Sequence, residues 1–582
     1  MSGVEAPTKG RPRFRGAARW ILPKRPDPAV VAALGSALSV PEPVARLLVM
    51  RGYSDDQSAK TFLRPRLDQL HDPLLLMGAD KAVERLAKAA MGGETVLIHG
   101  DYDVDGICST TIMTKVLRQF GAKAVPFIPR RIEDGYDLSA AGVNAAIDAG
   151  AQVVLTCDCG TSAVEPVAVL CRAGIDVIVS DHHLPGSTLP DCLAVLNPNQ
   201  GGCEYPDKHL AAVGVAFKLA LALAKRLGKN DAFIWRMLDL VALATVADVA
   251  RLSGENRVMV RYGLRMLAES ENVGLRAMIR AAGLDNKVLT TGRVGFILAP
   301  RLNAVGRIGH AIRGVELLMT DDVHEANTIA RELEELNAKR QELDRQTLQE
   351  AREMVAAIGD LSSTFGLVLA KDGWHPGVIG IVASRIVEEF GRPTIMIALE
   401  GDTGKGSGRS NSVMDLHEAL GETQDLLIRY GGHRAAAGVT ISRERVDEFA
   451  ARFNAVASTM LKPADLLPEV KIDMEIEIGG ANHELEKMLR HFEPFGIGNP
   501  TPVLVSREVA LAAPPRLVGQ DGLKLRLKTD AGELEAIGWG LADRIAEFDV
   551  TKKVDIAFRL ERDEYRGESR LQARIADIVP SP

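Results

Sequence analysis

The sequence predicts an α/β protein with two α/β lobes, a long helix joining them, and a C-terminal β-barrel of OB type. Three observations predict this fold class. Apolar strand patterns alternate with helical patterns from about residue 75 to 250, and again from about 360 to 455. The stretch from Asp321 to Ile358 has no Gly or Pro and mostly repeats apolar residues every three or four positions. Short strands of period two fill the end of the chain, as in small β domains.

We expect five segments along the chain. The first is a basic, disordered tail, because Lys and Arg dominate it and no apolar signal-peptide core is present. The next is a catalytic lobe with a helical part at its N-terminus, followed by the connector helix, the second lobe and the β domain. Their predicted ranges are 1–40, 41–320, 321–359, 360–460 and 465–582.

Individual elements follow from local patterns. The connector reads as one helix that ends at Gly359, with a break near Arg340 into two helices as the alternative. The remaining expected elements are strands at Val96–His99, Val153–Thr156, Gly366–Ala370, Thr394–Ala398, Leu523–Lys528, Val554–Leu560 and Leu571–Ile578, helices at Thr110–Phe120 and Val378–Phe390, and a turn at Arg566-Gly567.

Composition limits the classes of partner. The net charge of -7 over 582 residues argues against a uniformly basic surface, so nucleic-acid binding must depend on local basic patches or on metal ions. None of the six cysteines forms a paired CxxC zinc pattern, and we expect reduced thiols and a cytoplasmic location. No apolar run reaches the ~18 residues of a membrane span, so we expect no membrane contact.

Acidic and histidine residues follow four apolar segments of the first lobe. In an open parallel sheet such residues gather at the carboxyl ends of the strands. Carboxylate and imidazole ligands suit Mn²⁺, Mg²⁺ or Zn²⁺. The sequence therefore predicts a metal site, although a solvated acidic turn explains any one of these segments alone. The residues are His99, Asp101, Asp103 and Asp105 after 96–98, Asp158 after 153–157, Asp181, His182 and His183 after 177–180, and Asp248 after 240–247.

This ordered set resembles the DHH phosphoesterase superfamily. Further motifs resemble one family within it, the RecJ-type bacterial exonucleases specific for single-stranded DNA, over roughly residues 40 to 580. One departure is Cys159, where many relatives carry Asn after the aspartate; we expect little effect on metal binding. The motifs are PRRIEDGYDLS (129–139), PRLNAVGRIG (300–309), GWHPGVIGIVASRI (373–386), KGSGRS (405–410), GGHRAAAGVT (431–440) and PFGIGNPTP (494–502).

The resemblance implies lobes of DHH and DHHA1 type and a two-metal site for Mn²⁺ or Mg²⁺. Two cations about 3.5–4 Å apart can activate a shared nucleophile and clamp the attacked phosphate. The resemblance also implies that Asp158 bridges the two metals, that His99 and Asp103 bind one of them, and that Asp105, His182 and Asp248 bind the other. Catalytic roles fall to His183, Asp158 and Asp181, with Asp181 and Asp101 orienting their neighbours. The implied substrate-binding residues are Arg131, Arg307, Ser407, Arg409 and His433.

The predicted function is 5′-to-3′ hydrolysis of single-stranded DNA to 5′ mononucleotides, in DNA repair and recombination. An alternative is hydrolysis of short oligonucleotides, cyclic dinucleotides or pyrophosphate, and a second is a DNA-binding relative that has lost its metals. The β domain argues against the former, because small substrates need no extended binding surface, and the complete set of metal residues argues against the latter. We expect a monomer that works with single-strand-binding protein and a helicase.

Overall fold

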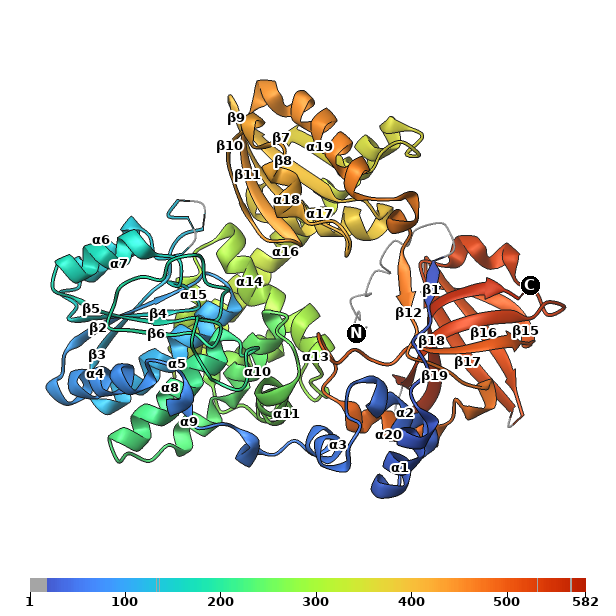
Figure 1. The fold of residues 1–582 in the computed structure, drawn as a ribbon, viewed down its shortest axis with the longest axis horizontal. Helices are drawn as coiled ribbons and strands as arrows, with labels where there is room; N and C mark the ends of the chain where they lie inside the picture. The colour runs from blue at the N-terminus through green and yellow to red at the C-terminus, as the bar shows by residue number, and fades with distance from the viewer. Residues whose placement is uncertain (1–17, 132, 136, 531, 566–567, 582) are drawn as a thin grey trace. The chain divides into compact units, whose positions relative to one another are not determined.

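A computed structural model describes residues 18–131, 133–135, 137–530, 532–565 and 568–581 (Figure 1). The chain divides into two compact units. One consists of residues 61–340 together with the short segment 492–500, and the other holds the rest of the described chain. We call the first the metal-site unit. The predicted turn at 566–567 lies outside the described residues.

The metal-site unit is built on a parallel sheet of five strands in the order β3-β2-β4-β5-β6. The order reverses between β2 and β4, and such a reversal opens a crevice at the carboxyl ends of the two strands. Both strands that we predicted here are present. The strands are β2 (Thr95–Gly100), β3 (Lys123–Phe127), β4 (Val153–Cys157), β5 (Asp176–Ser180) and β6 (Ala194–Leu196).

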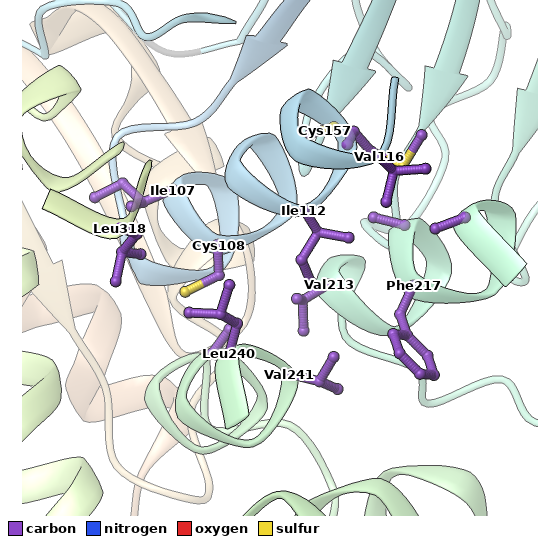
Figure 2. Packing of buried hydrophobic residues seen from close by; sticks show 14 of the residues in the cluster. Ile107, Cys108, Ile112, Val116, Cys157, Val213, Phe217, Leu240, Val241 and Leu318 are labelled. Carbon is purple, nitrogen blue, oxygen red and sulfur yellow. The ribbon is translucent and has the colours of Figure 1, made fainter. Parts of the chain in front are cut away.

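Helices pack against this sheet through a large apolar core. Figure 2 shows its centre, where Ile112 and Val116 of α5 lie near Val213 and Phe217 of α8 and near Val241 of α10. The helices, of which α3 begins just before the unit, are α3 (Asp56–Leu63), α4 (Ala79–Gly92), α5 (Val104–Phe120), α6 (Ala140–Asp148), α7 (Val164–Arg172), α8 (Ala212–Arg226), α9 (Ala232–Arg236), α10 (Leu238–Ala247), α11 (Gly254–Ala268), α12 (Val273–Ala281), α13 (Thr291–Arg293), α14 (Ala299–Ile308) and α15 (Ile312–Met319).

Two predicted elements differ from the structure. Helix α5 begins at Val104, six residues before the predicted start, because the Asp103 carboxylate caps it by accepting hydrogen bonds from the Asp105 and Gly106 amides. The apolar run before Asp248 is helix α10, so this aspartate follows a helix end. A short apolar run buried on all sides has no periodicity that separates a helix from a strand.

The connector is the single helix α16 (Val323–Ile358), without the break that we considered near Arg340. The Asp322 carboxylate begins it by accepting hydrogen bonds from the His324 and Glu325 amides. Gly359 follows it with φ 77°, a left-handed conformation that ends helices.

The second unit contains the predicted second lobe. Its sheet has the order β10-β11-β9-β8-β7, with only the pair β7–β8 parallel. The strand–helix–strand pattern that we predicted here is present as β7–α17–β8. The elements are β7 (Leu367–Asp372), α17 (Pro376–Phe390), β8 (Thr394–Glu400), β9 (Thr403–Arg409), α18 (Leu416–Gly421), β10 (Leu427–Gly432), β11 (Ala436–Ser442) and α19 (Val446–Met460).

The C-terminal part forms the predicted OB-type β domain. Its sheet has the order β13-β14-β18-β19-β17-β16-β15. The alternation in 523–528 is that of a half-buried strand, with Leu523, Leu525 and Leu527 buried. The elements are β12 (Glu469–Lys471), β13 (Met474–Glu475), α20 (His483–Leu489), β14 (Leu504–Val509), β15 (Leu511–Val518), β16 (Gly522–Thr529), β17 (Gly532–Trp539), β18 (Val554–Tyr565) and β19 (Glu568–Pro580).

The prediction of a disordered tail over 1–40 is wrong for its second half, while residues 1–17 lie outside the described residues. Strand β1 (Arg19–Ile21) pairs with β12, and the Trp20 indole donates to Asp577 at 2.8 Å. Asp27 caps helix α1 (Pro28–Leu38). Judged by its basic charge alone, this region gave no sign of its apolar run, in which Val31 and Leu34 are buried. Residues 41–60, predicted as part of the catalytic lobe, belong to the second unit and include α2 (Glu42–Met50).

Among the described residues, no single helix has both the length and the apolar character needed to cross a membrane. The pair α1 and α2, bent by 116°, meets the test of length and composition only when the two helices are taken together.

Candidate metal and phosphate site

The predicted metal residues converge at the carboxyl ends of β2, β4 and β5. His99 is on β2, Asp158 follows β4, and Asp181–His183 follow β5. Asp103 and Asp105 start α5, and Asp248 follows α10. Three groups have ligand atoms within 4.8 Å of one another, and they are Asp158, His182 and His183; Asp105, His182 and Asp248; and Asp101, Asp103 and Asp158.

His182 is central to this arrangement. Its Nε2 atom lies 3.3 Å from Asp158 Oδ1, 3.8 Å from Asp248 Oδ2 and 4.0 Å from Asp105 Oδ2. These four residues are the set that the resemblance implies for one metal. Tertiary packing brings them together from three strand or helix ends and the first turn of α5.

His99 lies beside Cys159. It is fully buried, its Nδ1 atom lies 3.4 Å from Cys159 Sγ, and it belongs to none of the three groups. Asp101, expected only to orient its neighbours, joins Asp103 and Asp158 instead. Strand β4 ends at Cys157, so Cys159 lies beyond the strand. The alternation of side chains along a strand therefore does not decide which way Cys159 points. The role of His99 as a ligand stays a prediction.

Asp181 orients the histidine pair. Its Oδ1 atom accepts hydrogen bonds from the His182 and His183 amides at 2.7 and 3.1 Å and lies 2.7 Å from His183 Nδ1. Its Oδ2 atom accepts from the Thr161 amide at 3.0 Å. Burial opposes its charge, but the bond with His183 lowers the pKa of Asp181. Asp181 therefore fixes the ring of His183 and compensates a charge on it.

The electrostatics of the cluster are those of a site with excess negative charge. Burial and the neighbouring carboxylates raise the pKa of Asp158 well above its ordinary value, that of Asp105 to about 7 and that of Asp248 to about 9. Burial lowers the pKa of both His99 and His182 to about 4, so their rings are neutral and can offer lone pairs. Divalent cations would relieve the repulsion between these carboxylates.

Several atoms of the cluster lack the partners that buried polar atoms ordinarily have. Among the described residues, the buried atoms His99 Nε2, Asp101 Oδ1, Asp158 Oδ1 and His182 Nε2 have no hydrogen-bond partner. Unsatisfied oxygen and imidazole nitrogen atoms beside crowded carboxylates are a donor set suited to Mn²⁺ or Mg²⁺. The residues present therefore fit divalent cations.

A pocket of about 290 Å³ opens beside the cluster. The Arg131 guanidinium lies over the Tyr102 ring, 4.8 Å from its centroid. Burial opposes protonation of His183, but the bond with Asp181 and the nearby carboxylates raise its pKa to about 9. The pocket thus combines cationic side chains with the acidic cluster, a suitable environment for a phosphate. Its lining residues are Asp101, Tyr102, Asp103, Arg131, His183, Ala247, Asp248, Asn303, Gly306 and Arg307.

Our sequence reasoning missed Tyr102, Asn303 and Gly306. Asn303 accepts a hydrogen bond from the Val104 amide at 3.3 Å and so supports the start of α5. A Cβ atom at Gly306 would lie 2.2 Å from the Tyr102 carbonyl oxygen, so only glycine lets α14 approach this loop. The signal was present, because Asn303 and Gly306 lie in the PRLNAVGRIG motif, but neither residue carries charge.

Ser407, Arg409 and His433 belong to the second unit. Arg409 Nη1 donates to Ser407 Oγ at 3.0 Å and to the Gly408 carbonyl at 2.7 Å, which holds the two side chains together on β9. His433 is exposed between β10 and β11. Arg131 and Arg307 thus lie beside the metal cluster, whereas Ser407, Arg409 and His433 lie within the second unit.

Comparisons with known proteins agree with this architecture. Residues 95–245 match the DHH family N-terminal domain, 363–459 the DHHA1 domain and 472–577 the RecJ OB domain. The single-stranded-DNA-specific exonuclease RecJ of Salmonella typhimurium is 38% identical over 87% of this chain and 91% of its own.

Two solved structures of RecJ from Thermus thermophilus resemble the whole fold. The Mn²⁺ complex has a TM-score of 0.83 and 32% identity, covering 97% of this chain and 80% of that one. The Mg²⁺ complex has a TM-score of 0.79 and 31% identity, covering 98% and 79%. With relatives of this identity along nearly the whole chain and three matching domains in order, the chain belongs to the RecJ family of single-stranded-DNA-specific exonucleases.

Proposed function

We propose that this protein is a metal-dependent exonuclease that degrades single-stranded DNA from its 5′ end to 5′ mononucleotides, in DNA repair and recombination. The observation that carries the proposal is the approach of His182 to Asp105, Asp158 and Asp248, beside a pocket lined by Arg131 and Arg307. Mn²⁺ or Mg²⁺ is the proposed cofactor, since each is present in a solved RecJ of the same fold.

Two cations are proposed, held by the carboxylates and histidines of the cluster. Asp105, His182 and Asp248 would hold one, His99 and Asp103 the other, and Asp158 both, with Asp101 as a further oxygen donor near Asp103. A bound pair of cations supplies Lewis acidity that activates water and neutralises the attacked phosphate.

The surrounding side chains bind and orient the phosphate. Arg131 and Arg307 offer guanidinium groups that can each donate two parallel hydrogen bonds to phosphate oxygens. His183, whose ring Asp181 orients through Nδ1, lines the same pocket and can donate a hydrogen bond to a bound phosphate. These donors stabilise negative charge that develops on the phosphate, which is the main catalytic contribution of such groups.

The function is tested by digesting single strands labelled at the 5′ or the 3′ end, beside duplex DNA and pyrophosphate, with Mn²⁺, with Mg²⁺ and with a chelator. We expect immediate release of 5′ label as mononucleotide, late loss of 3′ label, and no reaction with chelator. Rapid cleavage of pyrophosphate with intact strands would favour the short-substrate alternative.

Recognition of the 5′ end is assigned to Arg131, Ser407 and Arg409. Replacing Arg409 by alanine should weaken binding of 5′-phosphorylated strands about tenfold, because a charge-assisted hydrogen bond contributes about 1.5–3 kcal/mol. Binding of 5′-hydroxyl strands should change little. The measurement is fluorescence anisotropy with both strands and Ca²⁺ as a non-catalytic ion.

The matched control is Arg452→Ala, an exposed arginine of the same unit that pairs with Asp425. It should bind both strands as the unchanged protein does. Equal losses on both strands in Arg409→Ala would show that Arg409 serves general phosphate binding only.

The OB-type domain is proposed to hold the strand beyond the active site. Its outward strand face carries Lys524, Arg526 and Lys528, as the alternation in the sequence predicts, and Arg516 of the neighbouring strand lies opposite Lys524. Lys524 lies 2.9 Å from Glu535, however, and Arg526 lies 3.6 Å from Glu533. These ion pairs neutralise part of the positive charge, so the exposed Arg516 and Lys528 should carry most of the attraction.

Replacing both Arg516 and Lys528 by alanine should reduce the slope of log affinity against log salt by about 1–2 for long single strands. Short oligonucleotides should show no change. The control pair is Lys552→Ala with Lys553→Ala, which removes the same charge from a loop of this domain. An equal effect of the two double variants would indicate a response to net charge alone.

Further parts of the proposal concern the setting of the reaction. We place the protein in the cytoplasm, where its six free cysteines remain reduced. It acts as a monomer on strands that a helicase opens and that single-strand-binding protein covers. Light scattering of the purified protein tests the monomeric state, and pull-down with purified single-strand-binding protein tests that interaction.

A further inference from the structure

A nine-residue segment from the far end of the chain is built into the metal-site unit. Residues 492–500 include most of the PFGIGNPTP motif and belong to the same compact unit as residues 61–340. Five of their carbonyl oxygens accept hydrogen bonds from other parts of this unit. The donors are Arg257 to Phe492, Glu493 and Pro494 at 2.9, 2.8 and 3.2 Å, Arg261 to Glu493 at 2.9 Å, Thr291 Oγ1 to Phe495 at 2.7 Å and the Leu252 amide to Ile497 at 2.7 Å.

Arg257 is the main anchor of this segment. Its side chain is 2% exposed, and its guanidinium lies 4.0 Å from the centroid of the Phe62 ring. It also donates to the Phe62 carbonyl at 3.0 Å. Asn499, equally buried, donates to the carbonyls of Phe492 and Pro494 at 2.7 and 2.8 Å and closes the segment on itself. Buried donors of this kind are costly unless each is satisfied, so the position of the segment is closely defined.

The segment contacts the loop that follows Asp248. The hydrogen bond from the Leu252 amide to Ile497 joins the two backbones. A Cβ atom at Gly496 would lie 2.6 Å from Leu252 Cδ1, so this glycine allows the close approach. Gly498 lies against the side chain of Arg251 in the same way, with 3.2 Å between its ideal Cβ and Arg251 Nε.

The loop needs such support. Val249, directly after Asp248, has φ 62°, a left-handed conformation that a β-branched residue rarely adopts. A conformation of this kind persists only where the surrounding structure imposes it, at a cost of about 1–3 kcal/mol. The supports on the loop include the hydrogen bonds from Val249 to the Val246 carbonyl and from Ala250 to the Thr245 carbonyl. Further supports are the bond from Asn256 to the Arg251 carbonyl and the contacts with 492–500.

We propose that residues 492–500 are a positioning element for Asp248, and through it for the metal that Asp248, Asp105 and His182 share. The inference rests on the proposed function, because it acts through a metal ligand. The segment has no place in the chemistry itself. It holds the backbone that sets where the Asp248 carboxylate points, as supporting residues around metal ligands do.

The test is Gly496→Ala, whose added methyl group must displace the buried Leu252 side chain, and we expect the loop to shift with it. We expect one of the two Mn²⁺ ions to bind about tenfold more weakly and the other to bind unchanged. Isothermal titration without DNA gives both affinities, and a high Mn²⁺ concentration should restore cleavage. The control is Gly201→Ala, in the same unit, where an added Cβ has no neighbour within 4 Å.

Unchanged affinity for both ions, or equal weakening of both, would overturn the inference. If Gly496→Ala does not fold, Thr291→Val removes the hydrogen bond to Phe495 without adding bulk, and should weaken one ion by about threefold. A wild-type protein that binds no Mn²⁺ would instead refute the proposed function. If the wild-type protein binds two ions and the folded variants bind them with the same affinities, only the role of this segment is refuted.

Discussion

Replacing Asp158 by asparagine is expected to lower the rate of single-strand cleavage by about 10³-fold or more while the fold stays intact. Asp158 is the carboxylate that occurs in two of the three ligand groups, once with His182 and His183 and once with Asp101 and Asp103. Loss of its charge should weaken both metals, and metals contribute several kcal/mol to stabilising the transition state. Each 1.36 kcal/mol is a tenfold change in rate.

Asparagine is the informative replacement because Asp158 has φ 68°. Asparagine adopts this left-handed conformation readily, whereas alanine adds strain that confuses the result. Cleavage kinetics in Mn²⁺, metal titration and circular dichroism are the measurements, with the exposed Asp285→Asn as the control. Turnover close to that of the unchanged protein, with normal circular dichroism, would exclude Asp158 as the shared ligand.

Replacing Lys218 by methionine is expected to lower the free energy of unfolding of the metal-site unit by about 3–5 kcal/mol. Lys218, on α8, is 1% exposed, forms an ion pair with the buried Glu255 and donates to the His71 carbonyl at 2.6 Å. Glu255 also accepts from the Tyr205 hydroxyl at 2.6 Å and the His71 amide at 2.7 Å. Without Lys218 this carboxylate stays buried with no opposite charge.

The same helix offers a matched comparison. Arg226, also on α8, pairs with Glu84, and the two side chains are 47% and 60% exposed. Water screens an exposed pair of this kind, so Arg226→Met should barely change stability. Urea unfolding of both variants, followed by circular dichroism, makes the comparison. Similar midpoints for the two variants would mean that the buried network is not what stabilises α8.

The metal residues could be predicted because each of them follows a local apolar run. The runs before His99, Asp158 and Asp181 are strands of one parallel sheet, and the ends of such strands meet at one edge. Asp248 was found from the same pattern although its run is a helix. Asp248 does lie close to the other residues, as predicted, but the cause is the packing of α10 on α5 and α8, which the sequence pattern did not show.

Uncharged supporting residues were beyond the reach of these patterns. Tyr102 and Asn303 line the pocket without charge, and although Asn303 lies in a quoted motif, its residue type did not mark it as part of the site. The tail prediction failed for a related reason, since its basic residues outweighed the buried Val31 and Leu34 when composition alone was considered.

By itself, the sequence determined the fold class and the family, and it predicted which residues could hold metals. The fold class depends on periodicity over a few turns or one strand, which a single chain displays directly. The family was inferred from the resemblance of motifs that occur in order along the chain. Only the tertiary structure decided which donors approach one another, that Asp101 lies beside Asp103 and Asp158, and that residues 492–500 contact the loop after Asp248. Such contacts join residues from tens to more than two hundred positions apart, and they arise from burial and hydrogen-bond satisfaction that no local pattern encodes.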